Sequence, residues 1–363
     1  MAQEIIFVSL AVAFTLFVLV YIIMSVVPIT PFIYSNSRIQ AKANLLIPNQ
    51  KIKALTEAKS LRELASKLKD TGYIDDLNNT DIDNLKSFHK AIERNFFRSL
   101  KELNSLSPKV MRPLFESYMA FFEVKILKAI FRAKFSNTGI AEGTIYPIGR
   151  LDNIMLKRLV DTKTVADMAV ILEPTPYNEL FKESYSSTEE FEVAVENLAF
   201  DMFLKSAKSK MHDAKCIRDM IKKKCDIFNI LALIKMKVRK VDKARQKSLV
   251  VDTHSALSKK YDLLINAEKL EDFIRICKGL PYHDTLKEAY EKYKKDSMLV
   301  HFEHGLYRFF KNYVEDNELS HMLGPYPLFS YMIKKKNENK NLFIISKGID
   351  SRLSPKKIQE MII

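Results

Sequence analysis

Apolar residues recur along this chain with the three- and four-residue spacing of amphipathic helices. In the segment 55–77, leucine and alanine follow that spacing while lysine, arginine and glutamate occupy the opposite face. Glycine is scarce, at 8 residues in 363, and the periodic apolar runs are long, which gives strands little support. The pattern predicts an all-α protein.

One pattern occurs three times at nearly even spacing and aligns without a gap. The three copies cover residues 55–77, 159–181 and 264–286. Tyr73, Tyr177 and Tyr282 fall in one column of this alignment, and glycine or proline shortly precedes each of them. Because these residues interrupt helices, a helix is predicted to end before each tyrosine. We interpret the three tyrosines as structural positions whose hydroxyls are bonded near the turns between helices.

Two further elements repeat in step with the first. In one, an aromatic residue follows a glutamate by one helical turn, at Glu93–Phe97, Glu196–Phe200 and Glu303–Tyr307. In the other, an apolar stretch recurs at 126–132, 229–235 and 341–347, with a looser copy at 36–42. The constant order predicts units of about 105 residues. The predicted division is a segment 1–30, helical repeats at 31–123, 124–226 and 227–337, and a partial repeat at 338–363.

Local signals within the units mark helix starts and linkers. Ser60 and Thr164 each stand three residues before an acidic residue, which is the pattern of an N-terminal cap, so a preceding short helix is expected to break there. The segments 136–149 and 242–255 are predicted to be linkers, from glycine, asparagine and proline in the first and mixed polarity in the second.

The N-terminal segment is of a different kind. Ile5 to Val27 holds no charged residue, and at 1.5 Å per residue a helix of this length spans about 34 Å, enough for the hydrocarbon core of a bilayer. Pro28 and Pro31 follow it, and no basic start or cleavage site marks a signal peptide. We predict an uncleaved transmembrane anchor, with a signal peptide or a buried core helix as alternatives. Basic residues lie only after the segment, which places the soluble body in the cytoplasm.

Charge and cysteine content narrow the functional classes. The net charge is +14, with lysine-rich runs at 222–224, 235–245 and 334–336 that suggest phosphate neutralisation. These lysines are interspersed with 44 acidic residues, so solvated helix faces, or contacts with an acidic protein or anionic lipid, are the favoured interpretation over nucleic acid. The three cysteines form no CxxC pair, as expected of reduced thiols in the cytosol.

Candidate catalytic and metal-binding groups are weak throughout. His301 and His304 flank Glu303 at a spacing that suits a metal, but the equivalent glutamates of the other copies have no neighbouring histidine. The acidic pairs at 75–76 and 189–190 suit helix starts, and the glycines form no phosphate-binding loop. We expect no catalytic site, no metal and no cofactor.

Motifs near both ends carry a family resemblance. The turn 324–328 (GPYPL), the run 337–348, the opening motif 34–39 (YSNSRI) and the mid-chain motif 132–134 (RAK) resemble the C subunit of archaeal-type ATP synthases, which is related to the d subunit of vacuolar ATPases. The resemblance runs from about Tyr34 to the end. Tyr326 stands where the family has an acidic residue, and Gln40 and Lys42 also depart from its usual choices, which affects local contacts more than the fold.

The resemblance implies a fold and a function. Members are funnels of three similar helical domains around a pseudo-threefold axis, without a catalytic site. They cap the proteolipid rotor ring in the membrane and receive the D and F subunits of the shaft in their mouth. The expected protein is therefore a central-stalk rotor subunit that transmits torque during proton- or sodium-driven ATP synthesis or hydrolysis. It would lie at the cytoplasmic side of the cell membrane and bind no nucleic acid and no small-molecule substrate.

The predicted anchor departs from many relatives of this family. One hypothesis places Ile5 to Val27 in the lumen of the rotor ring, with Pro28 and Pro31 turning the chain out at the membrane surface. Positions that differ between repeats are the candidates for contact with an asymmetric shaft. The candidate interface residues are Arg38, Lys222, Lys223, Lys224, Tyr326, Lys334, Lys335 and Lys336.

Two other classes of function remain open at this point. A membrane-anchored helical scaffold of another complex would share the same helical signals and bind different partners, which a pull-down from solubilised membranes would identify. A membrane-tethered hydrolase or nucleic-acid enzyme would show turnover lost on His301→Ala or on substitution of a lysine run.

Overall fold

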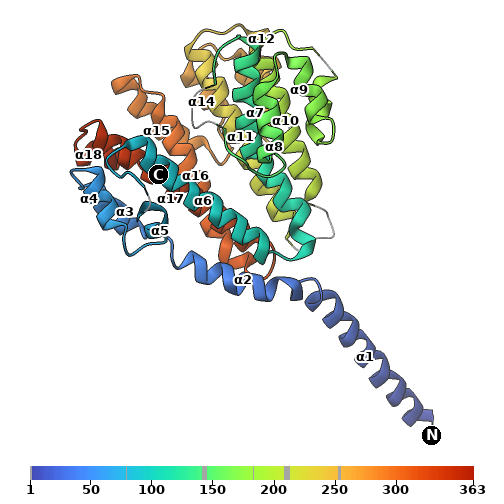
Figure 1. The fold of residues 1–363 in the computed structure, drawn as a ribbon. Helices are drawn as coiled ribbons and strands as arrows, with labels where there is room; N and C mark the ends of the chain where they lie inside the picture. The colour runs from blue at the N-terminus through green and yellow to red at the C-terminus, as the bar shows by residue number, and fades with distance from the viewer. Residues whose placement is uncertain (1, 79, 141–144, 183, 208–212, 252–254) are drawn as a thin grey trace.

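The protein is an assembly of helices with a single helix projecting from it (Figure 1). The structure, a computed structural model, describes residues 2–78, 80–140, 145–182, 184–207, 213–251 and 255–363. Every regular element within these ranges is helical, and the one strand-like pairing is the isolated bridge between Ile148 and Leu151. The prediction of an all-α protein is confirmed.

The α-helices of the N-terminal half are α1 (Ala2–Val26), α2 (Thr30–Ala43), α3 (Asn49–Leu55), α4 (Leu61–Lys67), α5 (Ile74–Asn78), α6 (Leu85–Leu106), α7 (Arg112–Phe135), α8 (Asn153–Asp161) and α9 (Val165–Leu172). Those of the C-terminal half are α10 (Thr188–Ser206), α11 (Ala214–Val238), α12 (Lys243–Ser248), α13 (Tyr261–Asn266), α14 (Leu270–Ile276), α15 (His283–Asp296), α16 (Val300–Glu318), α17 (Tyr326–Asp350) and α18 (Pro355–Met361). Short 3-10 helices are η1 (Lys109–Met111), η2 (Pro176–Phe181), η3 (Ser258–Lys260) and η4 (Leu319–His321).

Helix α1 stands apart from the body (Figure 1). Its segment Ile6–Val26 is long and apolar enough to cross a membrane, and none of it is buried against the rest of the described chain. That exposure is inconsistent with the alternative of a core helix. Helix α2 begins after a short turn, and Pro31 lies in its first turn, where a missing N–H leaves no helical bond unmade. Phe32 and Ile39 then bury one face of α2 against the body.

Three long helices organise the body. Helix α7 packs along α10, α11 along α16, and α17 along α6, so each long helix pairs with the helix that carries a repeated glutamate. Helix α17 also contacts α2, α3 and α4, which brings the end of the chain against its beginning. The predicted repeat boundaries at 124, 227 and 338 fall inside α7, α11 and α17. The division into repeats stays a prediction, but each of these boundaries would cut a continuous helix.

The helices before each repeated tyrosine follow the local signals. Helices α4, α9 and α14 all end before the tyrosine, as predicted. The Ser60 hydroxyl accepts from the Glu63 N–H at 3.1 Å, and Thr164 and Asp167 form a reciprocal capping box. The prediction of a linker over 242–255 is wrong in part, because the Asp242 side chain caps the short helix α12. The three cysteines lie buried in the core.

Each repeated tyrosine donates its hydroxyl to a buried carboxylate on a long helix. The pairs are Tyr73 with Glu338 (2.8 Å), Tyr177 with Glu123, and Tyr282 with Asp226 (3.0 Å). All six side chains are buried, with exposed fractions from 0% to 6%. A buried carboxylate without donors is costly, so these bonds fix how each long helix faces its short-helix turn. The hydroxyls are thus bonded to the long helices rather than to the turns themselves.

Each of these carboxylates accepts a further hydrogen bond from a second donor. The Arg150 N–H donates to Glu123 at 2.7 Å, the Ser255 hydroxyl donates to Asp226, and the Ile47 N–H donates to Glu338 at 2.5 Å. Gly149 makes the first contact possible: its φ is +57°, and a Cβ there would lie 1.8 Å from Glu123 Oε1. Burial raises the pKa of Glu123, and it raises the pKa of Asp226 to about 6.

The Tyr177→Phe substitution tests how much the hydrogen bond from the Tyr177 hydroxyl to Glu123 contributes to stability. Loss of one donor to the fully buried Glu123 should lower the free energy of unfolding by ~1–3 kcal/mol. Chemical denaturation of the full chain in detergent measures the change. Tyr34→Phe, at an exposed position, is the matched control and should change stability by less than ~0.5 kcal/mol. Equal stability of the two variants would show that the buried hydroxyl contributes nothing.

The pKa of Asp226 predicts a pH dependence of stability. Because its pKa is raised in the folded state, the folded chain binds the proton more tightly, and this contribution to stability is lost as pH rises from about 4 through about 6. Asp226→Asn keeps an acceptor for the Tyr282 hydroxyl and removes the titration. The free energy of unfolding, measured by denaturation at several pH values across this range, should therefore change less with pH for the variant. The same change of unfolding free energy with pH in variant and wild type would contradict the assignment of this titration to Asp226.

Candidate functional site: a lysine pocket between the long helices

A pocket of about 560 Å³ lies between α7, α11 and α17, with α10 and α16 also contributing to its wall. Its apolar lining includes Phe121, Phe200, Phe228 and Phe310. In Figure 1, α7 and α11 run on one side of the body and α17 on the other, and they diverge away from α1. The pocket is therefore enclosed by the three helices that the tyrosine–carboxylate bonds orient.

Equivalent positions of the three long helices line this pocket. Counted from the three buried carboxylates, the aligned sets are Tyr118, Ile221 and Ile333; Phe121, Lys224 and Lys336; and Lys125, Phe228 and Lys340. Within one helix these positions are three or four residues apart and share a face. The pocket is thus built by one repeated helix face that carries lysine in some copies and an aromatic or aliphatic residue in others.

Four lysine amines lie in this pocket against aromatic rings. Lys224 Nζ is 3.4 Å from the centroid of the Phe121 ring, and Lys340 Nζ is 3.9 Å from that of Tyr307. Lys336 and Lys125 lie farther from the Phe122 ring, at 5.3 Å and 6.0 Å. Lys125 is exposed and the other three are half-buried, and the attraction of aromatic faces for cations offsets part of the cost of this partial burial.

Carboxylates do not neutralise the four amines. Glu196 is the one acidic side chain of the lining among the described residues, and it is ion-paired with Lys128 at 2.5 Å. Glu303, beside the pocket, is paired with Lys235 at 2.5 Å. Lys235 is thus a fifth lysine of the lining, and within the described ranges the other four have no ion-pair partner. The pocket therefore holds an excess of positive charge in apolar surroundings.

Burial and mutual repulsion shift the titration of these lysines. Burial, followed by the charge of Lys125, lowers the pKa of Lys224 to about 7. Burial also lowers the pKa of Lys336 far below its usual value, and the charges of Lys125, Lys224 and Lys340 lower it further. Burial likewise lowers the pKa of Lys125 and of Lys340. In this protein alone, the charged state of the pocket opposes folding.

The predicted lysine clusters divide between different environments. Consecutive helical residues point about 100° apart, so neither triplet presents one continuous surface. Of 222–224, Lys224 enters the pocket, while Lys223 lies 4.4 Å from the Tyr313 ring and Lys222 is half-buried. Of 334–336, Lys336 enters the pocket and Lys334 is paired with Glu318. Lys335 is buried and bonded to Glu338 at 2.6 Å, and its assignment to a partner interface stays a prediction that this burial disfavours.

The other two interface candidates have contrasting positions. Tyr326 is buried and donates to the Val314 carbonyl at 3.0 Å, so it supports the turn before α17 and is not available to a partner. Its assignment to a partner interface stays a prediction, which the bond back to α16 disfavours. Arg38 is exposed on α2. The sequence analysis missed Lys125 and Lys340, although extending the third repeated element upstream by a few residues would have aligned them.

The weak metal candidate is arranged as separate pairs. His301 is bonded to Asp296 at 2.6 Å, and Glu303 is paired with Lys235. Among the described residues no group of three histidine, cysteine or acidic side chains could hold a metal ion. The side chains around His301 therefore meet separate partners and do not converge.

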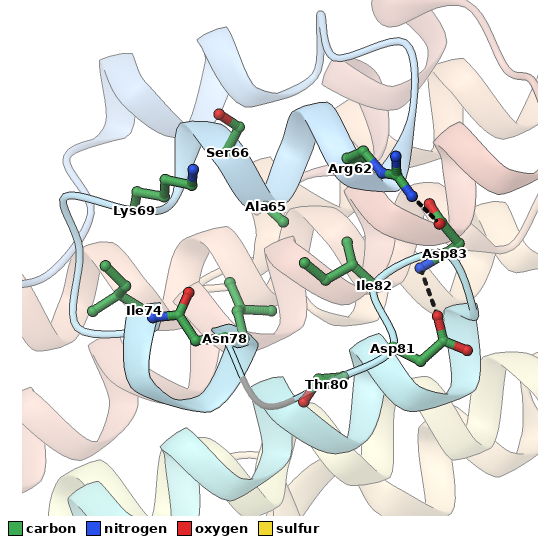
Figure 2. A pocket seen from close by; sticks show the side chains of 11 residues that line it. Arg62, Ala65, Ser66, Lys69, Ile74, Asn78, Thr80, Asp81, Ile82 and Asp83 are labelled. Atoms are coloured by element: carbon green, nitrogen blue, oxygen red, sulfur yellow. Dashed lines mark hydrogen bonds and ion pairs between the residues drawn. The ribbon is translucent and has the colours of Figure 1, made fainter.

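A second surface pocket lies between α4, α5 and the loop 80–83 (Figure 2). Arg62 is ion-paired with Asp83, at 2.5 Å, and Asp81 accepts the Asp83 N–H at 3.3 Å. Figure 2 shows these charged groups bonded to one another at the edge of the pocket, with Ile74 and Ile82 lining its floor. The ion pair between Arg62 and Asp83 joins two of its charged side chains, whereas the lysine pocket holds four lysines without such a partner in the described chain.

Comparison with known proteins gives the family. The model of the ATP synthase (C/AC39) subunit family matches residues 35–361. The chain belongs to this family, and the resemblance drawn from its motifs is confirmed.

Several relatives are each named as the C subunit of an A-type ATP synthase. That of Thermococcus onnurineus is 26% identical over 347 residues, covering 92% of this chain and 90% of the relative. That of Pyrococcus horikoshii is 26% identical over 339 residues, with the same coverage. That of Methanocaldococcus jannaschii is 25% identical over 359 residues, covering 95% of this chain and 90% of the relative. The similarity therefore extends over nearly the whole chain.

The pocket predicts an unusual pH dependence of stability. Lys125 on α7, Lys336 and Lys340 on α17 and Glu196 on α10 face Lys224. Because the pKa of Lys224 is lowered on folding, the unfolded chain binds the proton more tightly between pH about 7 and about 10, and stability rises with pH across that window.

Lys224→Met should reduce this rise, to which Lys336 and Lys340 also contribute, and raise stability at pH ~7 by at least ~1 kcal/mol. Denaturation of the full chain in detergent at pH ~7 and pH ~9.5 measures both effects. Lys215→Met, at an exposed position of the same helix, is the control and should keep the wild-type slope. A Lys224→Met variant with an unchanged slope would refute the repulsion argument.

Proposed function

We propose that this protein is a non-catalytic central-stalk subunit of an A/V-type ATP synthase, coupling the membrane rotor ring to the shaft. One observation carries the proposal. This member of the C/AC39 family has both an exposed apolar helix at one end and a positively charged pocket between three long helices. The relatives are named as subunits of A-type ATP synthases. Torque transmission requires a body that resists shear, and closely packed helices meet that requirement.

Features near α1 support attachment to a membrane assembly. Exposed apolar residues gather where α1 joins the body, on α2 and on the turns before α7 and α17. They are Ile33, Tyr34, Val110, Leu319, Met322 and Leu323. The Asn36 side chain donates to the carbonyls of Met322 and Gly324, at 2.8 Å and 3.0 Å, which holds the turn before α17 against α2. An apolar end beside a helix long enough to span a bilayer suits contact with the rotor ring.

The helix α1 has two possible positions in such an assembly. We propose that it lies in the lumen of the ring, because an anchor beside the ring would be dragged through the bilayer during rotation. Basic residues that follow α1 support a body on the cytoplasmic side. They are Arg38, Lys42, Lys51 and Lys53.

The lysine pocket is the proposed position of the shaft. It lies between helices that come from widely separated parts of the sequence, so a segment inserted there would contact α7, α11 and α17 together. A partner held by three helices at once cannot turn independently of the body. This arrangement suits a coupling protein without catalytic groups of its own.

Purification from solubilised membranes tests the proposed function. Tagged full-length protein should recover the proteolipid ring and the D and F subunits of the shaft, and the purified chain alone should show no ATP turnover. Recovery of an unrelated complex without either component would favour a membrane-anchored scaffold and would contradict the proposal.

Deletion of residues 1–30 tests the role of α1. The truncated protein should bind isolated rings at least ~10-fold more weakly, because the apolar contact with the lumen is lost, while its far-ultraviolet circular dichroism retains the helical body. A variant with the sequence 6–26 shuffled, equally apolar, is the matched control for simple membrane anchoring. If truncated and full-length proteins bind rings equally well, the lumen position is wrong; if the shuffled variant binds like wild type, α1 acts only through its apolar length.

A further inference from the structure

Four of the five lysines that line the pocket have no ion-pair partner in the described chain. Their amines come from three helices, and Glu196, which attracts Lys125, Lys224 and Lys336, is itself ion-paired with Lys128. Like charges beside apolar walls, where Lys224, Lys336 and Lys340 are half-buried, repel one another more strongly than in water, so the free protein keeps this arrangement at a cost to its stability. Such a cost is typical of a site that is completed by a binding partner.

The walls of the pocket favour one class of anion. Phe121, Phe200, Phe228 and Phe310 make much of the lining apolar. A small, compact phosphate would leave these rings against water. The main-chain N–H groups of the long helices are used within those helices, and no arginine lines the pocket in the described part of the chain, so bidentate phosphate recognition has no donors here.

Carboxylates on a protein segment match both properties. Their apolar neighbours cover the aromatic walls, and the carboxylates meet lysines that act as separate point charges. Lys224 lies on α11, while Lys336 and Lys340 lie one turn apart on α17. An inserted segment therefore meets positive charge from two sides.

We infer that this pocket binds an acidic, apolar-flanked segment of the shaft, with at least two carboxylates placed between Lys224 on α11 and the lysines Lys336 and Lys340 on α17. The inference rests on the proposed function and adds the chemistry of the contact. Insertion neutralises the repelling amines and links α11 to α17 through the partner. The contact is then both the electrostatic and the mechanical connection to the shaft.

Binding of the purified shaft subcomplex to the full-length protein in detergent tests this inference. The variant is Lys224→Gln/Lys336→Gln. The matched control is Lys215→Gln/Lys347→Gln, which removes two exposed lysines from the same two helices and gives the same net charge. Calorimetry should show affinity at least ~30-fold lower for the pocket variant and within ~3-fold of wild type for the control. The pocket variant should also lose much of the salt dependence of binding.

Thermal unfolding of the two variants separates binding from folding. The pocket variant should unfold at the wild-type temperature or above, because it removes repulsion. If the unfolding temperature of the pocket variant is well below that of the control, repulsion between the lysines does not destabilise the pocket, and the inference is overturned. Unchanged shaft affinity, or an equal loss in the control, overturns it as well. Failure of the wild-type protein to bind the shaft at all would instead refute the proposed function.

Zero-length cross-linking provides a direct readout. A carbodiimide joins a lysine amine to a carboxylate in contact with it, and peptide mass spectrometry locates the bond. Cross-links from Lys224, Lys336 or Lys340 to acidic residues of the shaft are expected in the complex. Cross-links confined to surface lysines would overturn the inference. Displacement of the shaft from the protein by inorganic pyrophosphate at equal concentration would overturn it as well.

Discussion

The orientation of the three long helices depends on one buried interaction, the hydrogen bond from a repeated tyrosine to a carboxylate. Glu123 illustrates how far the effect reaches. With about 100° per residue, Phe121 and Lys125 lie on the opposite side of α7 from Glu123. A bond that directs the carboxylate toward the short-helix turn therefore directs these two residues into the pocket. The same geometry holds at Asp226 and Glu338, so the supporting contacts and the binding surface are two faces of the same helices.

The positive charge that suits the pocket to its proposed function lowers the stability of the isolated protein. Four of its five lysines have no ion-pair partner in the described chain, and the lowered pKa values of Lys224 and Lys336 express what that arrangement costs the isolated protein. The tyrosine–carboxylate bonds and the packing of α7 on α10 offset this cost elsewhere in the fold. A protein that couples two partners benefits from such a distribution, because its scaffold stays rigid while its charged site is completed by one of them.

The sequence predicted the repeated frame better than the site. The tyrosine column was visible because Tyr73, Tyr177 and Tyr282 share a local pattern, and helix caps such as Thr164 follow from residues three apart. The carboxylate partners were missed because they lie on other elements, Glu338 being 265 positions from Tyr73. The lysine triplets were predicted together as candidate interface residues, but helical rotation separates neighbours, and only tertiary packing decides which of them lines the pocket.

The pairing of α17 with the first helices has a consequence for biosynthesis. The segment α3 to α6 leaves the ribosome early, yet its core is completed by Leu342, Ile345 and Ile358 from the end of the chain. Such distant contacts delay folding, because the intervening chain must be closed into a loop before they form. The amino-terminal region must therefore wait, partly unassembled, until α17 and α18 have been synthesised, which couples closure of this core to the synthesis of helices about 250 positions later in the chain.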